Sequence, residues 1–145
     1  MRYLRLSFLL FVFLYSCKTS GTEKIFANDC RATAIPCELD RLYTHPYEYN
    51  NKEIEIQGYY KWDSERSALY PNNSFSGRNA IWVDFSGSDS LKNDKGDLFN
   101  DSVSNFKNMT GRKIRITGLY KSGSSGHLGE YNGSIAEICR LEIYY

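Results

Sequence analysis

Apolar and polar residues alternate along two stretches of the chain, and this two-residue period predicts half-buried β-strands. The first stretch is KEIEIQGYYK, residues 52–61, and the second is RKIRITGLYK, residues 112–121. At the same offsets both carry isoleucine, isoleucine, glycine, tyrosine and lysine, whereas the charged residues between them differ. The chain therefore contains the same strand pattern twice.

Three further segments predict short strands: SALY before Pro71, NAIWVDFS at 79–86, and residues 135–144. In the last of these neither face is cleanly apolar, so we expect a β-bulge that shifts the alternation. The polar connection from 87 to 108 is expected to carry one helical turn near 98–106. An N-terminal helix is predicted with Pro36 at its first position, with Leu39, Leu42 and Tyr43 on one face, and with its end at His45-Pro46.

Five strands with one long connection predict a mainly β fold, a small closed barrel with one or two short helices, because closure removes unpaired edges. The repeated pattern resembles the first and fourth strands of the OB fold, which are neighbours in a five-stranded barrel. Antiparallel pairing of the two copies would place Glu53 and Glu55 opposite Lys113 and Arg115. The shared glycine is expected where a strand coils or where another backbone approaches closely.

A wider resemblance covers the chain from about residue 39 to its end. It rests on a helix ending in proline, the strand after residue 50, the ALY segment, and the loop GHLGEYNGSI. These features are similar to a family of uncharacterised bacterial secreted proteins and lipoproteins, although Asn50-Asn51 stands where a glycine turn is usual. The resemblance implies an OB-like barrel outside the cytoplasm, and it implies no activity.

The N-terminus predicts secretion. Arg2 and Arg5 precede an apolar run that is too short to span a bilayer, which is typical of a signal peptide. The run ends in LYSC, which resembles a bacterial lipobox with Cys17 as the lipidated residue. We therefore expect a signal peptide at 1–16, a lipidated tether at 17–28 and the barrel domain at 29–145. The predicted location is the cell envelope, with the outer membrane favoured because Lys18 follows the cysteine.

The other cysteines fit an oxidising compartment. Cys30, Cys37 and Cys139 allow one internal disulfide and leave one thiol over. Cys30 and Cys37 are close in sequence and are the predicted pair, whereas Cys139 is expected as a buried thiol in the last strand. A metal site is not predicted, because no CxxC motif or paired histidine accompanies these cysteines.

Charge argues against nucleic acid as a partner. Loss of residues 1–16 removes two of the 18 basic residues and none of the 17 acidic ones, which leaves a net charge of −1. A phosphate-binding protein is expected to be clearly basic. No cofactor motif is present either, so none is predicted.

Two groups of residues are candidates for partner contact. His127 and Glu130 lie in a glycine-rich loop, and Tyr60, Trp82 and Tyr120 belong to a set of aromatic residues on the strands. His127 and Glu130 supply one base and one carboxylate but no nucleophile, so the sequence does not favour catalysis. The predicted function is a non-enzymatic envelope binding or adaptor module for a protein or peptide. The alternatives are an envelope enzyme or enzyme inhibitor using the His127–Glu130 loop, and a structural component of an envelope assembly.

Overall fold

The computed structural model describes residues 21, 23–31, 33–76 and 79–145. The predicted signal peptide and the predicted lipidation site at Cys17 lie outside the described residues. In the described part of the chain, no helix has both the length and the apolar character needed to cross a bilayer.

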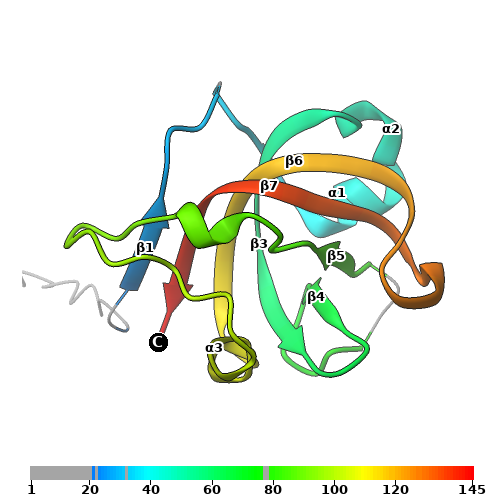
Figure 1. The fold of residues 1–145 in the computed structure, drawn as a ribbon. Coiled ribbons are helices and arrows are strands. Elements are labelled where there is room, and N and C mark those ends of the chain that lie inside the picture. The colour runs from blue at the N-terminus through cyan, green and yellow to red at the C-terminus, as the bar shows by residue number, and fades with distance from the viewer. Residues whose placement is uncertain (1–20, 22, 32, 77–78) are drawn as a thin grey trace, which may run out of the picture.

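Five strands form a closed barrel (Figure 1). They are β3 (Lys52–Trp62), β4 (Ser67–Tyr70), β5 (Ile81–Val83), β6 (Lys113–Ser125) and β7 (Tyr131–Tyr144). Hydrogen bonding runs from β3 through β4, β5, β7 and β6 back to β3, and only the β5–β7 pair in this circuit is parallel. The predicted mainly β, OB-like barrel is confirmed.

The two copies of the repeated pattern pair with each other in antiparallel fashion, with the Ile56–Ile116 pair in the middle. Ile56 of β3 lies opposite Ile116 of β6, while Ile54 faces Gly118 and Ile114 faces Gly58. Each buried isoleucine next to the centre thus meets the glycine of the other copy. The two isoleucines and the glycine of each copy are all buried in the core.

This register changes the predicted charge pairing. Arg115 lies opposite Gln57, and Glu55 lies opposite Thr117, so acids do not directly face bases. Arg115 reaches Glu55 only diagonally, with 3.9 Å between Nε and Oε1, and makes a closer contact of 3.2 Å to Glu142 of β7. The prediction that acidic and basic residues lie directly opposite each other is therefore wrong. Because the two strands pair around Ile56 and Ile116, each charged residue faces an uncharged one.

The shared glycines lie where neighbouring backbones come close, as predicted. A Cβ atom on Gly58 would lie 2.7 Å from the carbonyl oxygen of Tyr70, and one on Gly118 would lie 2.7 Å from that of Ala136. Both glycines therefore allow the strand to pack against the next strand of the barrel.

Gly118→Ala is expected to lower the free energy of unfolding by about 1–3 kcal/mol, the usual cost of overpacking. The added methyl group would press against the backbone of β7, which cannot move aside as a side chain can. Urea unfolding measures the loss. Gly96→Asn is the matched control, because Gly96 is open and left-handed and asparagine tolerates that conformation. Equal losses for the two variants would contradict the close approach.

The last strand carries the predicted bulge. Between the pairs Thr117–Arg140 and Leu119–Ala136, β7 advances by two more residues than β6. Glu137 lies in this interval with φ of 46°, in the left-handed region. The shift allows Ile135 and Ile138 both to be buried although they are three residues apart.

Two strands precede the barrel and alter the predicted N-terminal region. Strand β1 (Glu23–Ala27) pairs with β7, so these five residues of the expected tether at 17–28 are part of the sheet. Strand β2 (Ile35–Cys37) pairs in parallel with β3 and contains Pro36, which therefore does not begin a helix. Helix α1 (Leu39–Thr44) begins later, and after His45 the chain starts α2 (Pro46–Tyr49).

Helix α3 (Val103–Met109) lies at one end of the barrel, with α1 and α2 near the other (Figure 1). The described residues thus form three short helices instead of one or two, together with the single 3₁₀ turns η1 (Ser88–Ser90) and η2 (His127–Gly129). Phe106 of α3 packs against the rings of Trp62, Phe85 and Phe99. This aromatic contact attaches α3 to the core.

Candidate functional site

A cleft of about 370 Å³ lies between the β3–β4 and β6–β7 loops. Two tryptophans, one from β3 and one from β5, and the exposed His127 line it together with the β3–β4 turn, and the full lining is Trp62, Asp63, Ser64, Glu65, Arg66, Ser67, Trp82 and His127. Loops at this place position ligands in many OB folds. The cleft is therefore the candidate binding site.

The β3–β4 turn is held by Asp63. Its carboxylate accepts a hydrogen bond from the Glu65 backbone N–H at 3.1 Å and one from Arg66 Nε at 2.7 Å. Partial burial raises the pKa of Asp63, but these hydrogen bonds and the Arg66 charge outweigh it and leave the pKa below its ordinary value. The turn therefore presents a fixed ion pair at the edge of the cleft.

The opposite wall of the cleft is formed by the β6–β7 loop, whose conformation requires a glycine at position 126. Gly126 has φ of 76°, and a Cβ atom there would lie 2.5 Å from the ring of Trp82. The Ser124 hydroxyl donates to the Gly129 carbonyl oxygen at 2.8 Å, which closes the loop on itself. Between these points Leu128 is 84% exposed, with φ of 55°. The loop thus holds an apolar side chain in solvent, next in sequence to His127, which lines the cleft.

Of the predicted contact residues, Trp82 and His127 lie in the cleft and Glu130 does not. Trp82 is half-buried and His127 is exposed, and both line the cleft. Glu130 is exposed at the end of the loop, and its backbone N–H donates to the His127 carbonyl oxygen at 3.3 Å. The contact between these two residues is therefore one of backbone atoms, which does not orient the imidazole as a catalytic base requires.

The prediction that Tyr60 and Tyr120 contact a partner is wrong, because both side chains are buried. Their exposed fractions are 0% and 1%. Burial raises the pKa of Tyr120 to about 12, and it raises that of Tyr60 further although the Ser67 hydroxyl lies 3.1 Å from its own. The signal was present in the sequence, since both tyrosines lie on the same strand face as the buried isoleucines.

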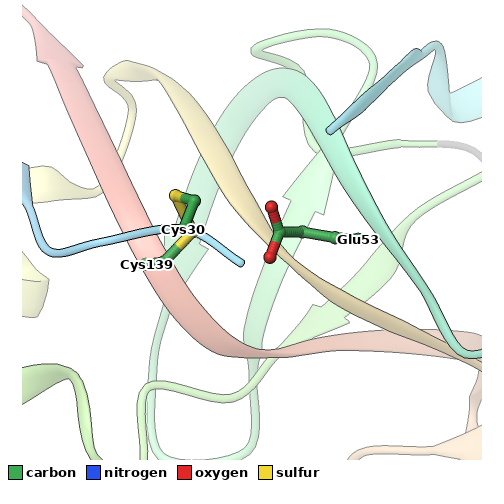
Figure 2. Close-up of side chains that lie close together, drawn as sticks. All are labelled: Cys30, Glu53 and Cys139. Carbon is green, nitrogen blue, oxygen red and sulfur yellow. A yellow bond between two sulfur atoms is a disulfide. The ribbon is translucent and has the colours of Figure 1, made fainter. Parts of the chain in front are cut away.

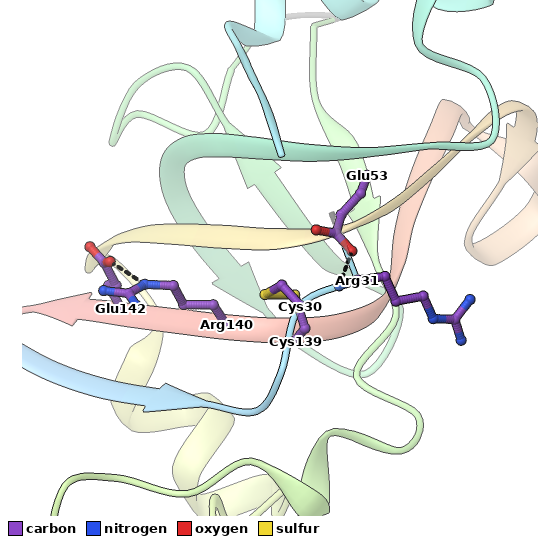
Figure 3. The surroundings of a disulfide bond; sticks show 6 residues. All are labelled: Cys30, Arg31, Glu53, Cys139, Arg140 and Glu142. Carbon is purple, nitrogen blue, oxygen red and sulfur yellow. Dashed lines mark hydrogen bonds and ion pairs between the residues drawn. A yellow bond between two sulfur atoms is a disulfide. The ribbon is translucent and has the colours of Figure 1, made fainter. Parts of the chain in front are cut away.

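The predicted Cys30–Cys37 disulfide is also wrong, because Cys30 bonds to Cys139 (Figure 3). Antiparallel pairing places Ala27 of β1 opposite Arg140 of β7, and the Asn28 N–H then donates to the Cys139 carbonyl oxygen at 2.8 Å. Cys30 follows directly and reaches Cys139. Cys37 instead lies on β2 next to β3, where it is the free thiol among the described cysteines.

Cys37 lines a second cleft, of about 510 Å³, with Arg41, Tyr49, Glu55 and Arg115 among its neighbours. Burial raises the pKa of the Cys37 thiol above its ordinary value, despite opposing hydrogen bonds with Tyr49 and Glu38. The thiol is therefore neutral at pH 7 and a poor nucleophile.

Alkylation of Cys37 by iodoacetamide is expected to be slow at neutral pH. The thiolate is the reactive form, so the rate should keep rising as the pH passes the ordinary thiol pKa of 9.0. Mass spectrometry of the Cys37 peptide measures the rate, and the same peptide in the urea-unfolded chain is the control. A rate that levels off below this pH, or one equal to that of the unfolded chain, would contradict the prediction.

A third cleft, of about 520 Å³, lies beside the disulfide and includes Asp29, Arg31, Glu53 and Glu137 in its lining. The Glu53 carboxylate points toward the two sulfur atoms (Figure 2). Sequence reasoning placed Glu53 only on an exposed strand face and could not foresee this neighbour, because the sulfurs come from segments far away in the chain.

No family model, no curated protein and no solved structure matches the chain. The barrel and its clefts are therefore the basis on which its function is inferred.

Proposed function

We propose that this protein is a lipid-anchored component of the cell envelope whose barrel binds a protein or peptide in the cleft lined by Trp62, Trp82 and His127. The lipobox-like segment ending at Cys17 supports the anchor. Attachment through several acyl chains would be firm, since each buried methylene contributes about 0.8 kcal/mol. The chain between Cys17 and β1 is then the short connection between lipid and barrel.

The observation that carries the binding proposal is the wall of the cleft. Trp82 is half-buried in this wall, and Leu128 is 84% exposed next to His127, on a loop closed by the Ser124–Gly129 hydrogen bond. A rigid loop that exposes an apolar side chain loses little conformational entropy on binding. Tryptophan is enriched among the residues that dominate binding energy. An extended peptide with apolar side chains that contact the cleft tryptophans and Leu128 is the expected partner.

The ion pair between Asp63 and Arg66 on the facing turn adds a polar border. Its Nη2–Oδ2 distance is 2.7 Å, and both side chains remain partly exposed. A polar rim around an apolar centre is the usual anatomy of a protein interface. The partner is therefore expected to pair polar groups with this turn while its apolar side chain enters the cleft.

Photo-crosslinking in cells tests the binding site. A photoreactive amino acid replaces Ser64, an exposed residue of the cleft wall, and in a matched control it replaces Tyr47 on α2, which is 84% exposed. We expect a discrete cross-linked envelope protein from position 64 and none from position 47. Leu128→Asp should abolish the product without unfolding the barrel, since Leu128 is exposed. Equal products from both positions, or none from position 64, would refute the proposed site.

Metabolic labelling with a fatty-acid probe tests the anchor separately. The wild-type chain is expected to incorporate the probe, and Cys17→Ala is expected to lose it together with membrane attachment. Labelling that persists in Cys17→Ala would refute lipidation at this cysteine and leave the cross-linking result to be judged by itself.

A further inference from the structure

Three side chains of types that can ligate a metal lie close together beside the cleft that contains Asp29 and Arg31. Cys30 follows β1, Glu53 belongs to β3, and Cys139 belongs to β7. One ligand atom from each, two sulfurs and a carboxylate oxygen, lie within 4.8 Å of one another. Figure 2 shows the carboxylate turned toward the sulfurs. The cluster is unrelated to the cleft of the proposed function.

The two oxygens of Glu53 have different surroundings. Oε2 accepts a hydrogen bond from the Arg31 backbone N–H at 3.2 Å, whereas Oε1 is buried and has no hydrogen-bond partner among the described residues. The Arg31 guanidinium points away (Figure 3) and pairs with Glu137 at 3.4 Å. A buried oxygen without a partner carries a desolvation cost, and a cation bound to it would offset this cost.

We propose that the reduced form of this protein binds a divalent metal ion of the zinc class through Cys30, Cys139 and Glu53. A dithiol reductant transfers two electrons and two protons to the disulfide, which becomes two thiols while the reductant becomes a disulfide. Metal binding then displaces both thiol protons, because thiolates are the ligands. Two thiolates and one carboxylate would give the ion three protein ligands, and a water molecule from the adjoining cleft lined by Asp29, Glu53 and Cys139 would complete four-coordination.

The ligand set and the spacing both suit zinc. Sulfur ligands favour borderline and soft ions over magnesium or calcium. With Zn–S bonds of about 2.3 Å, tetrahedral geometry places two sulfurs about 3.8 Å apart. The Cα atoms of the two cysteines are 5.3 Å apart, so rotation of the side chains after reduction can provide this separation. The disulfide and the metal therefore exclude each other, and the oxidised chain holds no ion.

The sequence predicts no metal site, because it lacks the short CxxC spacing. The ligands are brought together from residues 30, 53 and 139 by the pairing of β1 and β6 with β7 and of β3 with β6. The proposal therefore depends on tertiary structure alone.

Cobalt binding tests the proposal. The full chain carrying Cys17→Ser and Cys37→Ser is purified in mild detergent, so that Cys30 and Cys139 are its remaining cysteines. We expect the reduced chain to bind one Co²⁺ with a thiolate-to-cobalt charge-transfer band that Zn²⁺ abolishes, and the oxidised chain to show no band. Glu53→Gln should weaken binding at least about tenfold, since even second-shell changes cost 10- to 100-fold. Glu55→Gln, two residues along the same strand, is the matched control and should bind like the parent.

Three results would overturn the proposal: no charge-transfer band in the reduced chain, an unchanged band in Cys139→Ser, or equal affinity of the Glu53→Gln and Glu55→Gln variants. Circular dichroism is recorded at each step, because reduction can loosen the fold. If the reduced chain has unfolded, added Zn²⁺ is expected to restore its β signal, and failure to do so also refutes the site.

Discussion

Reduction of the Cys30–Cys139 disulfide is expected to lower the free energy of unfolding by about 3–5 kcal/mol in metal-free buffer. The bridge joins residues separated by 109 positions, and the loop-closure entropy of about 100 residues is worth up to about 4.7 kcal/mol. It also ties β1, the first strand of the described chain, to the last strand. Urea unfolding with and without a dithiol reductant, in the presence of a chelator, measures the loss.

The double variant Cys30→Ser/Cys139→Ser should match the reduced wild type and should not respond to reductant. Cys37→Ser is the matched control, because Cys37 is the free thiol among the described cysteines, and its variant should lose less than about 1 kcal/mol. A large loss in Cys37→Ser together with a small one in Cys139→Ser would mean that Cys30 and Cys37 are the bonded pair.

Glu142→Gln is expected to destabilise the protein by about 3 kcal/mol, at the low end for removing one partner of a buried ion pair. The Glu142 side chain is 5% exposed, and it accepts hydrogen bonds from Arg140 Nε and from the Tyr144 hydroxyl, each at 2.7 Å. Arg115 Nη1 lies 3.2 Å from its Oε2. The arginines are partly exposed, so water compensates some of their lost pairing. Glu130→Gln, at an exposed position, is the matched control and should change stability by less than about 0.5 kcal/mol.

The effect of Glu142→Gln should depend on pH. Burial raises the pKa of Glu142, but the hydrogen bonds from Tyr144 and Arg140 and the charges of Arg140 and Arg115 outweigh it, so the pKa lies below its ordinary 4.5. A depressed pKa in the folded state means that the ionised carboxylate stabilises the fold above pH 4.5 and that this stabilisation is lost as the pH falls through the folded value. Urea unfolding of both proteins should show their difference shrinking as the pH is lowered below 4.5. A difference that stays constant would contradict the charged network.

Much of the barrel followed from the spacing of residues in the sequence. The alternation of Ile54 and Ile56, and of Ile114 and Ile116, predicted two strands, and their shared glycine predicted a close approach. The broken alternation after residue 135 predicted a bulge in the last strand, and the structure places it at Glu137. These features are local, because a strand with one buried face records that face every second residue.

The candidate cleft was predicted in part. Trp82 and His127 were identified because aromatic and loop residues are typical of contact surfaces, and both line the cleft. Tyr60 and Tyr120 were misassigned because residue type was given more weight than strand face. The exposure of Leu128 could not be predicted from the sequence, since it depends on the hydrogen bond that closes the loop around this residue.

The sequence by itself therefore determined the five strands of the barrel and the barrel class. Only the tertiary structure decided that residues 23–27 pair with the last strand, and hence that Cys30 bonds to Cys139 beside Glu53. The physical reason is that β1 is short and largely exposed, so its pairing leaves no periodic pattern in the sequence. Contacts between residues more than a hundred positions apart depend on the closed barrel, and no local spacing records them.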